Sequence, residues 1–171
     1  MGYVSVGAMT LLSTIFAVSC VGKARNLKEF AGALRSFASE RTSMLLAAMV
    51  TALEGLTLLA FAISLAGVRW AAVLGFLLAG SLLLAFTLVM RRIQGAHCHC
   101  FGKHGTRYSA RHVVRNVLLT SAAMAGLVEH HGAAGPEPDG IIVAMAFGLL
   151  IGLFVVMMDD LVEVLRPAGS R

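Results

Sequence analysis

The sequence predicts an all-helical, polytopic membrane protein, and three observations support that fold class. Hydrophobic residues make up 58% of the 171-residue chain and charged residues only 13%, about half the charged fraction of a typical soluble domain. The mean hydropathy is +0.83. Long apolar runs recur along the chain, separated by short polar segments. We therefore predict a single integral-membrane domain over residues 1–171, embedded in the lipid bilayer of the cell membrane.

Five apolar segments are candidates for membrane-spanning helices. A hydrocarbon core about 30 Å thick requires roughly 20 helical residues. The fourth segment is the shortest and contains Arg115 and Asn116, so we expect it to cross only if the Arg115 side chain extends toward the lipid headgroups. The predicted bundle therefore has five spans, at about residues 4–21, 44–66, 70–90, 113–128 and 140–158.

The segment after the first span contains both charged and apolar residues. Phe30, Leu34 and Phe37 recur at helical spacing among these charges and predict a short amphipathic helix over residues 28–43. Basic residues follow the first apolar run instead of preceding it, unlike those of a cleaved signal peptide. We therefore expect Cys20 to remain in the mature chain, in the last turn of the first span.

The basic residues predict the orientation of the bundle. In a five-span arrangement, 13 of the 14 lysines and arginines lie on one side of the membrane, and only Arg69 lies on the other side. An excess of basic residues marks the cytoplasmic side, so the N-terminus is predicted outside, the C-terminus inside and the 91–112 loop in the cytoplasm. The net charge of +5 follows from this topology and gives no support for nucleic-acid binding.

The sequence "HCHCFGKH", residues 97–104, is the candidate segment for thiol chemistry. A Cys-x-Cys disulfide closes a small, strained ring, and strained disulfides are typical of labile, catalytic pairs. Positive charge nearby lowers the pKa of a thiol, so His99 is predicted to tune Cys98 and Cys100. Cys20 would lie at the same membrane face and provide a third thiol.

The same segment allows two other interpretations. Two thiolates and one or two imidazoles can bind Zn²⁺ or Cu(I), which would make this a metal-handling site. A one-residue spacer forms a cramped chelate, however, and the preferred hypothesis assigns no metal ligand. The third interpretation is a polar loop with incidental thiols. The residues of the metal alternative are His97, Cys98, His99, Cys100 and His104.

Three stretches of the sequence resemble one family of membrane proteins. They are "FAVSCVGKARNLKEFAGAL" at 16–34, "CHCFG" at 98–102 and "RHVVRNVLL" at 111–119. These stretches are similar to the methylamine utilisation protein MauE family, within the DoxX-like membrane proteins. The resemblance implies maturation of a disulfide-rich periplasmic client together with a thioredoxin-like partner, with the chemistry centred on Cys98 and Cys100. With this pair inside, a periplasmic client requires transfer across the membrane or a partner that reaches the inner face.

Glu54 lies near the middle of the second predicted span. An ionisable group at that depth costs several kcal/mol and is a functional candidate by default. We favour a neutral or internally paired Glu54 that fixes helix packing. The alternative is a proton acceptor coupled to thiol oxidation, or a contact for a quinone cofactor.

Two further residue patterns are predicted to have no catalytic role. Ala144, Gly148 and Gly152 form a small-residue face that permits close helix packing, either within the bundle or in a homodimer. A cluster between the last two spans could bind a divalent ion but is predicted to be solvated; it comprises Glu129, His130, His131, Glu137 and Asp139.

The sequence thus favours a membrane thiol-disulfide exchange protein or electron relay, in enzymatic terms a thiol-disulfide oxidoreductase. It would support disulfide formation or maturation of a client, together with a thioredoxin-like redox protein. The alternatives are a non-enzymatic scaffold subunit of a maturation complex, with dispensable cysteines, and the metal-handling protein.

Overall fold

The computed structural model describes the backbone of residues 2–35, 39–92, 97–98, 106–107, 110–132 and 138–165. Within these residues the fold is all-helical apart from one two-residue antiparallel ladder, which confirms the predicted class. The ladder pairs β1 (His97–Cys98) with β2 (Thr106–Arg107) between the fourth and fifth helices. The six described helices are α1 (Tyr3–Arg25), α2 (Leu27–Leu34), α3 (Glu40–Leu65), α4 (Arg69–Arg92), α5 (Ala110–Gly132) and α6 (Pro138–Leu165).

Four helices of the described part are long and apolar enough to cross a membrane. They are α1, α3, the Arg69–Val89 part of α4 and the Asp139–Met158 part of α6. The bundle also exposes many large apolar side chains, and Ile142, Val143, Phe147 and Leu150 of α6 are each at least 65% exposed. An apolar surface of this extent is unfavourable in water and suits a bilayer. The chain is therefore a membrane protein.

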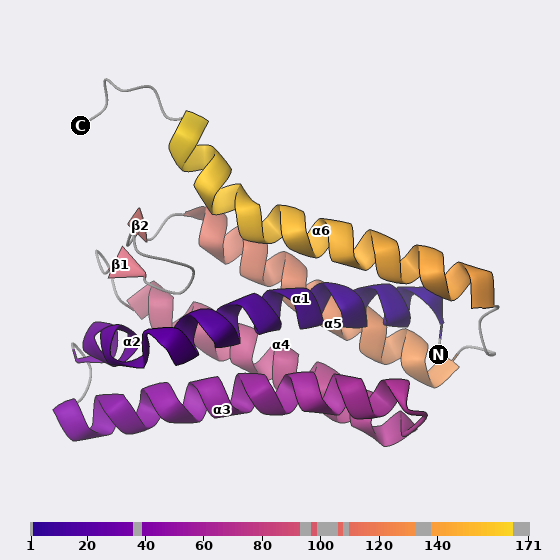
Figure 1. The fold of residues 1–171 in the computed structure, drawn as a ribbon, viewed down its shortest axis with the longest axis horizontal. Helices are drawn as coiled ribbons and strands as arrows, with labels where there is room; N and C mark the ends of the chain where they lie inside the picture. Colours follow the sequence, from indigo (N-terminus) through magenta and orange to yellow (C-terminus); the bar gives the residue numbers. More distant parts are fainter. Residues whose placement is uncertain are drawn as a thin grey trace.

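Helix α5 corresponds to the predicted fourth span but is longer than residues 113–128. Its 23 residues extend about 35 Å at 1.5 Å per residue, and it lies alongside α1 and α4 (Figure 1). It is not among the four apolar candidates, because polar residues such as Arg115 and Asn116 lower its hydropathy. A fifth crossing through α5 remains a prediction.

The Arg115 side chain lies within the bundle. Arg115 is only 9% exposed, and Asn116 beside it is buried, so both belong to the interior of the bundle and not to its lipid-facing surface. The full length of α5 is sufficient for a span without any extension of Arg115 toward the headgroups.

Helix α1 is the central helix of the bundle and packs against α3, α5 and α6 (Figure 1). Its apolar face, which includes Leu12 and Phe16, joins buried residues of α3, α4 and α5 in one core. Across that core the Phe61 and Phe76 rings meet edge to face, with centroids 5.2 Å apart and planes at 67°. This geometry is favourable for aromatic pairs and ties α3 to α4.

Small residues bring α1 and α6 into close contact. A Cβ atom added to Gly148 would overlap the backbone of Gly7, and one added to Gly152 would lie 2.9 Å from the Cβ atom of Thr14. The predicted small-residue face is therefore used within the chain, against α1. The homodimer suggested for Ala144, Gly148 and Gly152 is corrected accordingly, because α1 covers this face.

The turns around α3 have clear local causes. Ser39 is the N-cap of α3, and its Oγ accepts a hydrogen bond from the Thr42 backbone N–H at 3.4 Å. After α3, Gly67 adopts a φ of +98° and donates its N–H to the Ser64 carbonyl at 3.0 Å. This left-handed conformation favours glycine and turns the chain directly into α4.

The predicted amphipathic helix over residues 28–43 is shorter in the structure. Helix α2 ends at Leu34, and Glu40–Ser43 already belong to α3. Phe30 and Ala31 are buried against Ala47 of α3, so the apolar face of α2 packs on the bundle. Phe37 lies outside the described residues.

The contact between α1 and α6 predicts a specific sensitivity to substitution. Gly148→Ala should lower the free energy of unfolding by about 1–3 kcal/mol, as overpacking does, because the clash is with backbone. The measurement is thermal unfolding of the detergent-purified protein. Gly55→Ala is the matched control, since a Cβ there meets nothing within 4 Å, and it should cause no loss. Equal midpoints for the two variants would contradict close packing of α6 on α1.

Candidate functional site

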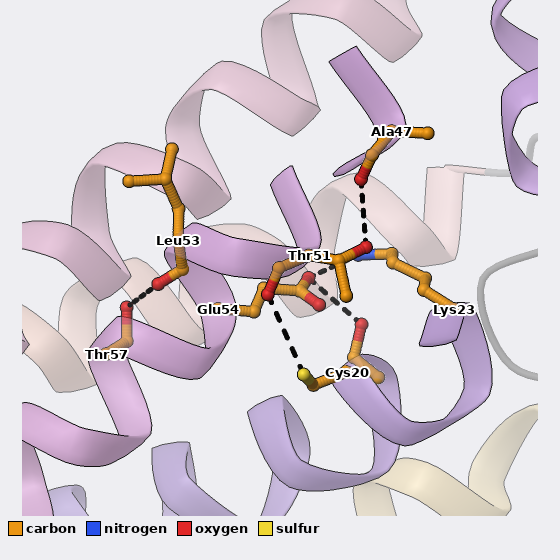
Figure 2. A network of polar contacts seen from close by, with 8 residues as sticks. Cys20, Lys23, Ala47, Thr51, Leu53, Glu54 and Thr57 are labelled. Carbon is orange, nitrogen blue, oxygen red and sulfur yellow. Dashed lines mark hydrogen bonds and ion pairs between the residues drawn. The ribbon is translucent and has the colours of Figure 1, made fainter. Parts of the chain in front are cut away.

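A buried polar cluster lies between α1 and α3 in an otherwise apolar bundle. Ser19 and Lys23 are four residues apart on α1 and so share one helical face, which meets Glu54 of α3. Their exposed fractions are 6%, 4% and 5%, respectively. Figure 2 shows Lys23 and Glu54 directed toward each other from the two helices.

The Glu54 carboxylate is satisfied on one oxygen only. Its Oε1 accepts hydrogen bonds from the Lys23 ammonium, which forms an ion pair with it, and from Ser19 Oγ at 3.1 Å. Glu54 Oε2 is buried and has no hydrogen-bond partner among the described residues. The sequence interpretation of Glu54 as internally paired is borne out in this contact, and its partner is Lys23.

Helix α2 covers the other side of the ion pair. Lys23 Nζ lies 5.1 Å from the centroid of the Phe30 ring, within the range of a cation–π interaction. A buried ion pair is tolerated only when its partners are well compensated. Phe30 thus contributes to the pair by shielding the ammonium and by holding α2 on α3.

A cavity of about 60 Å³ adjoins the ion pair. One water requires roughly 10–15 Å³ measured in this way, so the cavity has room for a few waters. An aromatic ring needs more, since benzene occupies a cavity of about 150 Å³, and a quinone ring at Glu54 would require the helices to separate further. The polar residues that line the cavity are Ser19, Lys23, Glu54, Arg115 and Asn116.

Cys20 is part of the same region of the α1–α3 interface (Figure 2). Its Sγ donates a weak hydrogen bond to the Thr51 carbonyl at 3.7 Å, and Thr51 lies one helical turn before Glu54. Because α1 continues to Arg25, Cys20 is more than one turn from the helix end, deeper than expected. The thiol is partly buried and not in a disulfide.

The Cys-x-Cys segment lies only partly within the described residues. Cys98 belongs to β1, where its backbone pairs with Thr106 of β2. Figure 1 shows this ladder at the same end of the bundle as α2 and the end of α1. His99, Cys100 and His104 lie outside the described residues, so their predicted roles remain predictions. The part of the chain that is described contains no group of three or more His, Cys, Asp or Glu residues arranged for a metal ion.

Sequence reasoning missed the partners that surround Glu54. The predicted first span ends at residue 21, which leaves Lys23 among the basic residues that follow the span, but α1 includes Lys23 and buries it. The available signal was the four-residue spacing of Ser19 and Lys23, which is helical.

Arg115 and Asn116 of α5 were recognised as polar residues in a predicted span, but the sequence did not indicate that their side chains lie inside the bundle. Asn116 Nδ2 donates to Thr87 Oγ1 at 3.2 Å, which joins α5 to α4.

At the opposite end of the bundle, two residues of the expected solvated cluster hold helices together. Glu129 Oε2 accepts a hydrogen bond from the Ser5 backbone N–H at 2.6 Å, in the first turn of α1, where N–H groups lack helical partners. His130 is buried, and its Nε2 lies 3.0 Å from the Arg69 carbonyl. The expectation that these two side chains are solvated was wrong.

The buried ion pair predicts a strong asymmetry between single and double substitutions. Lys23→Met leaves the Glu54 charge uncompensated and should destabilise the bundle by about 3–5 kcal/mol, whereas the double variant Lys23→Met/Glu54→Gln should recover most of that loss. Thermal unfolding in detergent measures both. The control is Arg35→Met, because the Arg35–Glu40 pair is 58% and 80% exposed and should contribute less than about 1 kcal/mol. Additive losses in the double variant would argue against a coupled pair.

Comparison with known proteins identifies the family of the chain. Neither the curated proteins nor the solved structures give a significant match to the chain. The family model of methylamine utilisation protein MauE matches residues 1–129. The match includes α1 to α4, most of α5, all three cysteines and the buried Lys23–Glu54 pair. The resemblance recognised in the sequence is thereby confirmed, and this membrane protein belongs to the MauE family of methylamine utilisation proteins.

Proposed function

We propose that this chain is the membrane component of a thiol-disulfide relay that supports disulfide formation in a client protein, together with a thioredoxin-like partner. Cys98 and Cys100 are the reactive pair, His99 tunes their reactivity, and Cys20 is a third thiol that exchanges with the pair. In enzymatic terms the chain acts as a thiol-disulfide oxidoreductase.

The observation that carries the proposal is the position of Cys20. A free thiol lies between two helices of the bundle, close to a buried cation and carboxylate. The helix that bears it runs toward the same end of the bundle as β1, which contains Cys98 (Figure 1). A thiol that is partly buried within the helices is protected from indiscriminate oxidation, while its position near the Cys-x-Cys end suits exchange with one defined partner disulfide.

Membership of the MauE family supports the same function. The family description concerns methylamine utilisation. The resemblance of the "CHCFG" segment implies a role in the maturation of a disulfide-rich client protein. Exposed or strained disulfides exchange readily, and basic residues lie on both sides of the Cys-x-Cys segment in sequence. These features favour thiol exchange over a scaffold role without chemistry.

The orientation proposed for the relay follows from the basic residues. Helices α1 and α4 end, and α3 and α5 begin, at one end of the bundle (Figure 1), and Arg25, Lys28, Arg35 and Arg92 belong to this end. Arg69 begins α4 at the other end. We assign the basic end to the cytoplasm, with the N-terminus outside, the C-terminus inside and α5 as a fifth span.

Thiol trapping in intact cells tests the relay. Acid quenching followed by alkylation with a mass-tagged maleimide should reveal a fraction of wild-type protein in which two thiols are protected. Cys98→Ser and Cys100→Ser should each abolish that protection or accumulate a mixed disulfide with another protein. Cys20→Ser serves as the comparison that separates the pair from the third thiol.

Complete alkylation of all three thiols in every strain would refute the relay. A scaffold role would then be tested by client maturation in the triple serine variant. The metal alternative would be tested by metal analysis of the purified protein with and without Cys98→Ser.

Reporter fusions test the proposed topology. Alkaline phosphatase fused after Gly67 or after Gly132 should be active, because both positions are assigned to the outside, and fusion after Arg35 should be inactive. An inactive fusion after Gly132, with the other two results as expected, would exclude α5 as a span. The reverse pattern at Arg35 and Gly67 would invert the whole bundle.

A further inference from the structure

Exposed side chains of α1 and α3 mark where the hydrocarbon core ends at the basic end of the bundle. On α1, Val18 and Val21 are exposed and apolar, and Arg25, one turn further along the same face, is exposed and charged. On α3 the order is reversed, since Arg41 is exposed near the start and Leu45 is exposed one turn deeper. Exposed apolar side chains suit lipid tails, and exposed guanidinium groups suit headgroups. Arg25 and Arg41 therefore lie at headgroup level.

Helix α2 is placed among the headgroups by the same observations. Asn26 alone separates α2 from α1 in sequence, and Phe30 and Ala31 pack against Ala47 in the first part of α3. Figure 1 shows α2 at the end of the bundle, beside the start of α3. This placement does not depend on which side of the membrane is the cytoplasm, because it follows only from where exposed side chains change from apolar to charged.

The exposed face of α2 is basic and open. Lys28, Gly32 and Arg35 follow one another at spacings of four and three residues, so they share one helical face, and all three are exposed. A Cβ atom added to Gly32 would meet nothing within 4 Å, so the backbone between the two cations is accessible. An anionic group can therefore approach Lys28 and Arg35 together.

Cations outnumber carboxylates on this surface. The exposed charged side chains of residues 25–41 are Arg25, Lys28, Glu29, Arg35, Glu40 and Arg41. Arg35 is paired with Glu40 through Nη2, whereas the other three cations form no ion pair with another described residue. The surface therefore has positive charge that its own carboxylates do not neutralise.

Neighbouring elements add to the positive charge of this end. The arginines that end α4, belong to β2 or begin α5 are Arg91, Arg92, Arg107 and Arg111. The last two turns of α6 contain the acidic residues Asp159, Asp160 and Glu163. Figure 1 shows this end of α6 on the opposite side of the bundle from α3. The acidic residues of α6 are thus separated from the surface formed by α2 and the start of α3.

We propose that the exposed face of α2, together with Arg25 and Arg41, binds the phosphate headgroup of an anionic membrane phospholipid. Clusters of about four to eight basic residues next to a membrane-spanning helix attract anionic lipids, and guanidinium groups bind phosphate oxygens through paired hydrogen bonds. Exposed apolar side chains lie one turn deeper than the cations on both α1 and α3. A phospholipid contacts both layers, which favours a lipid over free phosphate.

The bound lipid would hold a helix that also covers the buried ion pair. Helix α2 has eight residues, and isolated helices of this length are unstable in water. On its inner face Phe30 lies over the Lys23 ammonium, and on its outer face Lys28 and Arg35 meet the headgroup. Lipid binding therefore stabilises the folded bundle and raises its unfolding midpoint.

The test measures the affinity of the detergent-purified full chain for a short-chain phosphatidylglycerol, with the thermal unfolding midpoint as the readout. Phosphatidylcholine of the same chain length, which has no net charge, is the comparison lipid. The wild type should bind phosphatidylglycerol more tightly. Arg25→Gln/Lys28→Gln should weaken this binding about tenfold or more, since each basic residue near an anionic lipid surface contributes roughly fivefold, and should leave the affinity for phosphatidylcholine unchanged.

A control at the other end of the bundle separates this surface from general charge effects. Arg69 is an exposed arginine at the start of α4, and Arg69→Gln should leave the affinity for phosphatidylglycerol unchanged. Equal affinities of the wild type for the two lipids, or equal weakening in the control variant, would overturn the proposal. Inorganic phosphate is the third probe, and a midpoint shift as large as that with phosphatidylglycerol would overturn the assignment to a lipid.

The sign of the charge provides a second, independent variant. Glu29→Gln removes a negative charge from the same helix and should strengthen phosphatidylglycerol binding, and weaker binding would argue against the proposal. Folding is checked by the midpoint of each variant without lipid. If the double variant does not fold, Lys28→Gln carries the test with an expected loss of roughly fivefold, and an unchanged affinity overturns the proposal. None of these measurements uses a cysteine, so their outcome is separate from that of thiol trapping.

Discussion

The buried ion pair between Lys23 and Glu54 constrains much of this bundle. Each charge alone inside apolar helices would be strongly unfavourable, so α1 and α3 must bring the two groups together. Phe30 of α2 shields the ammonium, and a cavity lined in part by Lys23 and Glu54 has room for a few waters. The placement of α1, α2 and α3 follows from compensating these charges as well as from burying apolar surface.

Helix α1 packs closely against α6 on one face and makes polar contacts with α3 on another. Toward α6 it uses small residues, and Gly7 and Gly148 allow the two backbones to approach closely. Toward α3 it presents Ser19 and Lys23 to the carboxylate. Its first turn is held from α5 by Glu129. A helix fixed at its start, along its length and near its end offers a rigid support for a thiol, which favours a defined position for Cys20.

The buried ion pair lies near the helical thiol to which the functional proposal assigns exchange. Charges inside a membrane protein are expensive and are retained where they perform a task. In this chain the Lys23–Glu54 pair lies at the same α1–α3 interface as Cys20. The free oxygen of Glu54, which has no structural purpose among the described contacts, is the feature that a purely structural pair would lack.

The fold class, the approximate positions of the long helices and the family could be predicted from the amino-acid sequence, because apolar runs and the "CHCFG" and "RHVVRNVLL" segments are local patterns. The sequence also identified Glu54 as a buried group and Ala144, Gly148 and Gly152 as a packing face. The pairing of Glu54 with Lys23, which lies beyond the predicted end of the first span, became evident only in the folded bundle. The same is true of the contact between the small-residue face and α1, and of the helix contacts made by Glu129 and His130. Hydropathy along the chain measures how polar a residue is, whereas the partner that compensates its charge or hydrogen bonds comes from a helix distant in sequence.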